Sequence, residues 1–230
     1  MAIEQVQGTV LMDQRAKLLY NHWSTIYREK GAPYRQDMNP SKFRNILDSV
    51  FILDWESTTD VRFRLAGSRI CDSFGIELRG MNLFSFWQGE DRARLRQLLH
   101  RVVTEPCVGH AVGVQKSECG VSSDFEILLL PLKQRDDQPK QIIGCTILTK
   151  ENGDTSYCLP ISSQWIDGIT VYDIPNHESF QPSKIHINST NVAAEKRVSE
   201  LYSRPSKPFR GGLHAHPFRV IQGGLAREQG

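Results

Sequence analysis

The chain has 230 residues, of which 39% are hydrophobic and 23% are charged, enough to bury the core of one or two domains. Its 28 basic and 26 acidic side chains nearly balance, so the overall charge gives no reason to expect nucleic acid as a partner. No run of residues approaches the ~18 apolar residues of a membrane span, and the first residues have no signal-peptide pattern. We therefore expect a cytoplasmic protein without membrane insertion.

Five cysteines are spread along the chain without a CxxC pair: Cys71, Cys107, Cys119, Cys145 and Cys158. An odd number at wide spacing indicates no disulfide framework, and unpaired cysteines supply no zinc or dithiol motif. The cysteines therefore favour a reducing compartment, and we expect no bound metal.

Residues 1–39 are expected to form an amphipathic helix followed by a linker. From position 12 onwards apolar residues recur at helical spacing, Asp13 suits an N-cap, and Gly31 suits a stop. The candidate interface residues on the apolar stripe are Leu19, Trp23 and Ile26. Two surfaces could bury them: the sheet of the same chain, or the equivalent surface of a second copy in a homodimer. In both cases we expect Trp23 to be the anchor.

Residues 40–150 have the pattern of one α+β domain. A short helix is expected in "NPSKFRNIL", followed by two strands in "SVFILDWES" and "VRFRL" with the turn "STTD" between them. Short helical turns broken by Gly75 and Gly80 come next, and then a longer helix in "EDRARLRQLLHRVV". Three further strands are expected in "CVGHAVGVQ", "SDFEILLLPLK" and "QIIGCTILTK".

Residues 151–230 have scattered apolar residues, many Ser, Asn and Pro, and no sustained periodicity. We expect a tail of low order. Two pieces of it could order locally: a short helix in "STNVAAEKRVSELYS" and a terminal edge strand in "PFRVIQGG".

Several segments resemble a family of small alphaproteobacterial PAS-domain proteins. They are "GAPYRQDMNPSKF", "RFRLAGSRICDSFGIELRGMNLFSFW", "EILLLPL", "IIGCTIL" and the final "FRVIQGG". The resemblance implies a PAS-like five-stranded antiparallel sheet with helices on one face, preceded here by the N-terminal helix. It also implies a sensory or interaction module with a cavity between the sheet and the helices.

Seven residues are candidates for the lining of such a cavity: Phe63, Leu65, Cys71, Phe74, Phe84, Trp87 and Leu128. Alternation in the segment 61–65 predicts that Phe63 and Leu65 face the core, whereas Arg62 and Arg64 face solvent. The aromatic residues could line a pocket for an apolar ligand, or they could only fill the core.

The arginines of this region could bind an anion such as a nucleotide. They are Arg62, Arg64, Arg69 and Arg79. Charged residues opposite a core face are also typical of any half-buried antiparallel strand, and we favour that interpretation.

Cys71 and His100 raise the alternative of a sensor that carries flavin or haem. One PAS subclass forms a flavin adduct through a helical cysteine flanked by asparagine and arginine, whereas Cys71 lies in "RICDS". Haem-binding members place an axial histidine near the position of His100, which borders an apolar stripe here. Packing explains Cys71 and a boundary position explains His100, so we expect no cofactor.

The sequence has no nucleophile–base pair, no paired carboxylates and no phosphate-binding loop. We therefore expect a non-catalytic PAS regulatory protein that acts by contact with another signalling protein, as a homodimer. A small molecule or nucleotide in the cavity would modulate this contact. The flavin or haem sensor is the alternative, and an enzyme is the least favoured interpretation.

Overall fold

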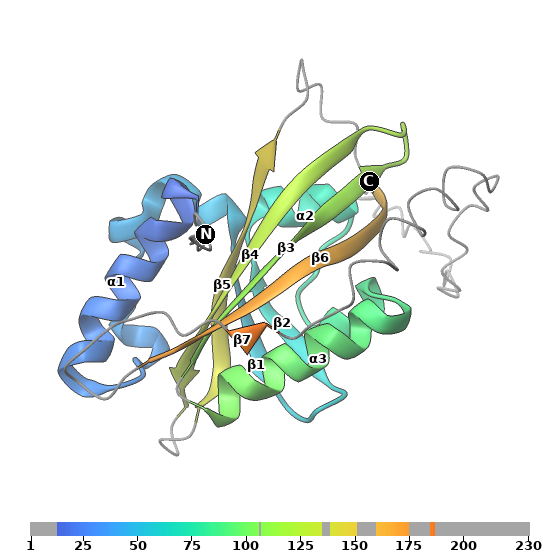
Figure 1. Ribbon diagram of the computed structural model, residues 1–230. Coiled ribbons are helices and arrows are strands. Elements are labelled where there is room, and N and C mark those ends of the chain that lie inside the picture. Colours follow the sequence, from blue (N-terminus) through green and yellow to red (C-terminus); the bar gives the residue numbers. More distant parts are fainter. Residues whose placement is uncertain (1–12, 106, 135–138, 151–159, 175–184, 187–230) are drawn as a thin grey trace, which may run out of the picture.

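The computed structural model describes residues 13–105, 107–134, 139–150, 160–174 and 185–186. Within these residues the strands form one antiparallel sheet of seven strands, in the order β2-β1-β5-β4-β3-β6-β7 (Figure 1). The strands are β1 Val50–Trp55, β2 Val61–Ala66, β3 Cys107–Ser117, β4 Ser122–Lys133, β5 Pro139–Lys150, β6 Ile161–Asp173 and β7 Ile185–His186. The helices are α1 Gln14–Lys30, α2 Ser68–Phe74 and α3 Gly89–Thr104, with 3-10 helices η1 Arg35–Asp37, η2 Pro40–Ser49 and η3 Leu83–Phe86. The predicted PAS-like α+β fold is confirmed.

Helix α1 begins and ends where the sequence predicts. The Asp13 carboxylate accepts a hydrogen bond from the backbone N–H of Arg15 at 2.7 Å, as an N-cap does. Gly31 ends the helix with a φ of 75°, and its N–H donates to the carbonyl of Tyr27 at 2.8 Å. Both ends of this helix are therefore fixed by local chemistry.

The predicted β1–β2 hairpin is confirmed, but its register shifts along its length. Leu53 pairs with Phe63 whereas Ile52 pairs with Leu65, so Arg64 is an extra residue in β2. A bulge of this kind turns the residues beyond it to the opposite face of the sheet. Leu65 is 45% exposed for this reason, and the prediction that it faces the core is wrong.

The core has two layers, one on each face of the sheet. On β4, Ile127 and Leu129 belong to the layer beneath α3, whereas Leu128 and Leu130 belong to the layer beneath α1. Figure 1 shows α1 on one side of the sheet, with α2 and α3 on the other. Helices thus cover both faces of the sheet. The PAS resemblance implied helices on one face only, and α1 packs on the other.

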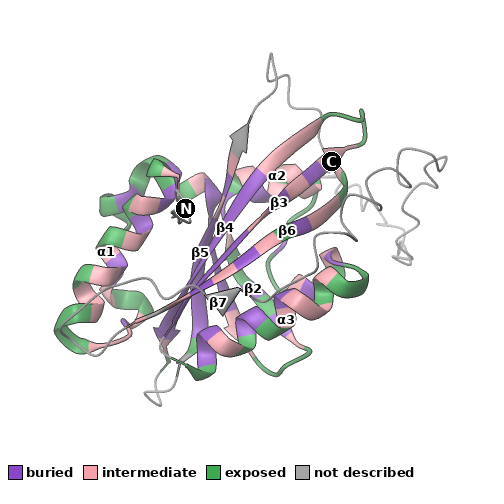
Figure 2. Ribbon diagram, viewed as in Figure 1, coloured by how far each residue is buried: buried purple, intermediate pink, exposed green. Residues whose placement is uncertain are grey.

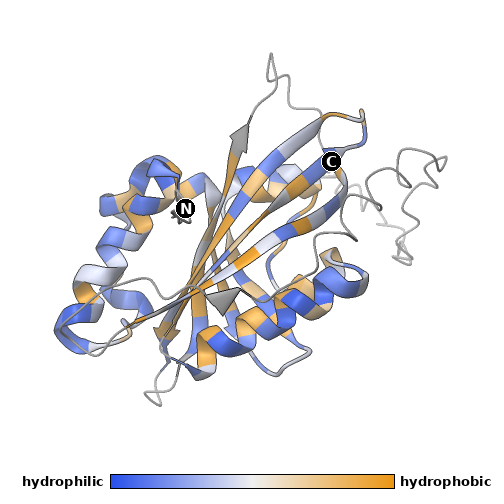
Figure 3. Ribbon diagram, in the orientation of Figure 1, coloured by the Kyte–Doolittle hydropathy of each residue, from blue (hydrophilic) through white to orange (hydrophobic). Residues whose placement is uncertain are grey.

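The burial and hydropathy of the residues follow this two-layer arrangement. Buried residues run along the middle of the central strands and the sheet-facing sides of the helices (Figure 2). Hydrophobic residues follow the same course, whereas the outer sides of α1 and α3 are mostly hydrophilic (Figure 3). The amphipathic pattern of each helix therefore tells which of its sides contacts the sheet.

Strand β6 corrects the prediction for the segment after Lys150. Its residues pair with β3 from Cys107↔Asp173 to Ser117↔Ile161, so the expectation of a tail without regular structure is wrong for residues 161–173. The register shifts at Asp167, and this bulge interrupts the alternation that would have marked a strand in the sequence. The predicted helix at 189–203 and edge strand at 217–224 lie outside the described residues.

Candidate functional site

A cavity of about 50 Å³ lies between the sheet and the helices α2, η3 and α3. Most of its lining is hydrocarbon, supplied by strands β1 to β6 and by the short helices. The apolar lining residues are Phe51, Phe63, Ile70, Phe74, Leu83, Trp87, Leu95, Phe125, Ile127, Leu129, Leu148 and Ile161. A site of this kind suits an apolar ligand.

Five polar residues also line the cavity: Arg69, Ser73, Gln115, Thr146 and Gln164. Gln115 is 8% exposed, which places its amide in the interior. The amide of Gln164 donates to the carbonyl of Phe86 in η3 at 3.0 Å. Buried amides give a mainly apolar pocket its few hydrogen-bonding positions, which determine how a ligand is oriented.

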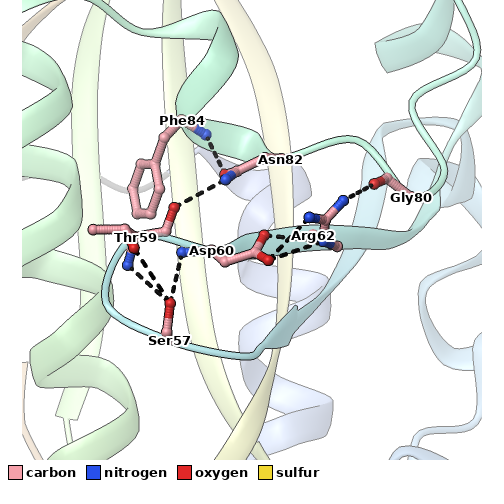
Figure 4. Close-up of polar contacts among 7 residues, drawn as sticks. All are labelled: Ser57, Thr59, Asp60, Arg62, Gly80, Asn82 and Phe84. Carbon is pink, nitrogen blue, oxygen red and sulfur yellow. Dashed lines mark hydrogen bonds and ion pairs between the residues drawn. The ribbon is translucent and has the colours of Figure 1, made fainter.

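A polar network holds the segment that leads into η3 against the β1–β2 hairpin (Figure 4). The Asn82 side chain accepts from the N–H of Phe84 at 3.0 Å and donates to the carbonyl of Thr59 at 2.9 Å. Arg62 donates to the carbonyl of Gly80 at 3.0 Å and forms an ion pair with Asp60. These contacts position Leu83 and Trp87 over the cavity.

Three of the seven predicted cavity residues line the cavity: Phe63, Phe74 and Trp87. Phe84 is buried in the same core layer, but its neighbour Leu83 takes the lining position. Cys71 packs beside that layer, and its thiol lies 4.0 Å from the carbonyl of Ala66. Phe84 and Cys71 therefore lie near the cavity without lining it, and the predictions for Leu65 and Leu128 are wrong.

Leu65 and Leu128 lie away from the cavity for different reasons. The β2 bulge exposes Leu65, as described above. Leu128 is fully buried, but it belongs to the core layer under α1. Its two neighbours, Ile127 and Leu129, line the cavity instead. The run "ILLL" is apolar on both faces, so alternation could not show which residues face which side.

Two glutamines of the cavity were missed by the sequence analysis. Gln115 stands at the end of a predicted strand, in phase with the buried residues Ala111 and Cys107, and this phase was the available signal. Gln164 belongs to β6, which was not predicted as a strand. Without β6 no sequence signal placed Gln164 near the cavity.

The sequence of residues 12–147 matches the PAS domain family. The chain belongs to the PAS-domain family. No curated protein sequence is detectably similar to it. Among solved structures, the LOV protein of Rhodobacter sphaeroides is 17% identical, with a TM-score of 0.37 over 50% of this chain and 71% of that one.

Two further solved structures are similar to this PAS domain at the same low level. The dark structure of the blue-light photoreceptor Aureochrome1 LOV is 14% identical, with a TM-score of 0.36 over 47% of this chain and 80% of that one. The PAS-B domain of Drosophila melanogaster Cycle, with bound glycerol, is 17% identical, with a TM-score of 0.34 over 43% of this chain and 99% of that one. Similarity this low carries no argument about function, so the sequence match alone places the chain in the family.

Cys71 and His100, the two residues considered for flavin or haem, do not line this PAS cavity. The Cys71 thiol points to Ala66 and Glu77 and does not line the cavity, so it is not placed to form an adduct with a ring bound there. His100 is exposed on α3, with its ring 6.0 Å from that of Trp55, so it is not placed as an axial ligand. The described residues contain no group of three or more His, Cys, Asp or Glu that could hold a metal ion.

The arginines of the PAS domain do not gather around an anion site. Three of them are each paired with an aspartate: Arg62 with Asp60, Arg64 with Asp54, and Arg69 with Asp48. Their charges are therefore matched within the chain. This arrangement does not favour a nucleotide phosphate as the ligand.

The candidate interface on α1 is mostly buried within the chain itself. Leu19 and Trp23 lie on the side of α1 that faces the sheet and are 0% and 1% exposed. Ile26 is half-buried beside them. The Trp23 indole N–H donates to the carbonyl of Pro131 in β4 at 2.9 Å. Of the two surfaces expected to bury this stripe, the chain uses its own sheet, with Trp23 as the anchor. Leu19 and Trp23 are thus not available to a second copy.

Four of the five cysteines lie in the part of the chain that the structure describes. Cys71 and Cys145 are free, and burial raises the pKa of the Cys145 thiol, which keeps it protonated. Cys119, in the turn between β3 and β4, is disulfide-bonded. The wide cysteine spacing gave no indication of this disulfide. Among the described helices, none is long and apolar enough to cross a membrane.

Proposed function

We propose that this protein is a non-catalytic PAS sensor whose cavity binds a small, largely apolar molecule. The observation that carries the proposal is an apolar cavity whose lining also includes two glutamine amides, Gln115 and Gln164. The ligand that suits this lining has an apolar body and one or two groups able to hydrogen-bond to an amide.

The size of the cavity limits the ligand. About 50 Å³ of space is far below the roughly 300–1,000 Å³ typical of pockets for drug-sized ligands. A ligand of a few heavy atoms fits the cavity as it stands. A larger one requires the η3 segment to move, which means breaking the hydrogen bonds of Asn82 to Thr59 and of Arg62 to Gly80.

Strand β4 connects the cavity on one face of the sheet to α1 on the other face. Ile127 and Leu129 line the cavity, while Leu128 and Leu130 pack under α1 on the opposite face. A ligand that shifts β4 therefore changes the surface on which α1 rests, and a partner that prefers one position of α1 would sense the ligand. We propose that this partner is another signalling protein, and that the protein acts as a homodimer through surfaces other than the buried stripe of α1.

Native mass spectrometry of the protein purified from its own cells tests this proposal. We expect a small-molecule adduct on the wild-type chain. The substitution Leu129→Phe adds volume at a cavity-lining side chain that is 1% exposed, so the adduct should be lost. The matched control is Val121→Phe, which adds a ring at a residue 49% exposed between β3 and β4 and should keep the adduct. A wild-type chain without an adduct, or an adduct that persists in Leu129→Phe, would contradict the proposal.

A further inference from the structure

His110 of β3 and Glu126 of β4 form a buried pair on the face of the sheet that α1 covers. They are 1% and 3% exposed, and the His110 Nε2 atom lies 3.4 Å from the Glu126 Oε1 atom. Neither of these two atoms has a hydrogen-bond partner among the described residues. Buried polar atoms are almost always satisfied in folded proteins, so this pair requires an explanation that packing alone does not supply.

The other oxygen of Glu126 holds the start of α1. The backbone N–H of Asp13, the N-cap residue, donates to Glu126 Oε2 at 2.9 Å. A carboxylate at this end of a helix is stabilised by the helix dipole. The Glu126 carboxylate thus bridges the N-cap of α1 and the imidazole of His110, a side chain that ordinarily takes up a proton between pH 5 and 8.

The charge of the pair depends on that proton. With neutral His110 the pair has a net negative charge that is buried, and Glu126 Oε1 has at most a neutral N–H of the imidazole as its donor. When Nε2 binds a proton from solvent, the pair becomes an ion pair without net charge, and a small approach turns the 3.4 Å separation into a charge-assisted hydrogen bond. An unpaired buried charge is far more costly than a paired one. Protonation of the pair therefore stabilises the buried Glu126 carboxylate in the position where it accepts the Asp13 N–H at the start of α1.

We propose that His110 and Glu126 form a proton-dependent latch that fastens the N-terminal end of α1 to the sheet and loosens it as the pH rises. The latch regulates the position of α1 without requiring a ligand in the cavity. The inference therefore goes beyond the proposed function and stands or falls separately from it.

The other charged or titratable groups around the pair are Asp13 and Arg15 of α1, Cys145 of β5 and Tyr172 of β6. The Arg15 side chain lowers the pKa of Asp13, which stays ionised at neutral pH. Burial raises the pKa of both Cys145 and Tyr172, which stay neutral there. Among these side-chain types, imidazole is the one that ordinarily changes charge near neutral pH.

Hydrogen exchange of the full chain, read by mass spectrometry at about pH 6 and about pH 8.5, tests the latch. After correction for the intrinsic exchange rate, we expect the protection of α1 amides to fall about tenfold at the higher pH, with α3 as the internal reference. The substitution Glu126→Gln keeps an acceptor for Asp13 N–H but removes the charge, so the pH dependence should vanish. His110→Gln removes the titrating group and should do the same, which keeps the test valid if one variant folds poorly.

Two controls separate the latch from other ionisations. Asp124→Asn removes a charge two positions along β4 and should leave the pH dependence of α1 intact. His22, on α1 itself, accepts a hydrogen bond from Asn39 N–H at 2.9 Å, and burial lowers its pKa. Because its protonation breaks that bond, His22 loosens α1 as the pH falls, which is opposite to the latch. A wild-type chain whose α1 protection does not change with pH, or a change that survives in both Glu126→Gln and His110→Gln, would overturn the proposal.

Discussion

Adjacent leucines on α1 show how much one position matters at the scale of single residues. Leu19 is fully buried against the sheet, whereas Leu18 is 38% exposed. We expect Leu19→Ala to lower the free energy of unfolding by about 2–5 kcal/mol, because it removes buried methyl groups and leaves a cavity. Leu18→Ala is the matched control and should change it by less than about 0.5 kcal/mol.

Urea denaturation of both variants checks this prediction. A similar loss of stability in the two would show that α1 is not packed as described. A large loss in Leu19→Ala alone would support the packing of α1 on its own sheet, which leaves Leu19 unavailable to a partner.

At the scale of elements, Gly144 of β5 lies too close to β4 and β1 for a side chain to fit. A Cβ at Gly144 would lie 2.4 Å from the carbonyl oxygen of Leu128 and 2.4 Å from the ring of Phe51. We expect Gly144→Ala to cost about 3 kcal/mol or more, since the clash is partly with backbone. Gly31→Ala is the comparison: its Cβ meets nothing within 4 Å, and only its backbone, at φ 75° and ψ −161°, is strained, which costs about 1–3 kcal/mol.

Thermal unfolding of the two glycine variants measures this difference. Equal destabilisation would mean that β5 can move away from Leu128 and Phe51, and hence that the sheet around the cavity is less tightly packed than its geometry indicates.

The sequence predicts elements well where local chemistry determines them. The N-cap Asp13, the C-terminal Gly31 and the hairpin turn at residues 57–60 act over a few residues, and each was found. The extra residues Arg64 and Asp167 could not be predicted in the same way. A bulge depends on the partner strand, and it changes the face of the residues that follow it.

The same limit explains the outcome for the candidate site. Aromatic residues of the short helices, such as Phe74 and Trp87, were placed correctly because they precede or follow glycine-marked turns near the sheet. The face of Leu128 was wrong, because β4 is apolar on both faces and gives no alternation to read. The pair of His110 and Glu126 was not singled out, because their proximity depends on the register of β3 against β4.

At the scale of the whole molecule, one sheet separates two core layers. The cavity lies on one face, and α1 with the His110–Glu126 pair lies on the other. In the two proposals, a ligand in the cavity and a proton on the His110–Glu126 pair therefore act on α1 from opposite faces of the sheet. Both effects pass through β4, which supplies Ile127 and Leu129 to the cavity and Glu126 to the pair.

The most direct test of this coupling is an NMR experiment on the full chain under xenon pressure, because xenon enters apolar cavities without specific contacts. We predict shifts at Phe125, Ile127 and Leu129, and also at the Trp23 indole N–H and the amides of α1 around Leu19. Both sets of shifts should disappear in Leu129→Phe and remain in Val121→Phe. Shifts confined to the cavity lining, with α1 unchanged, would contradict the claim that this PAS domain transmits occupancy of its cavity to α1.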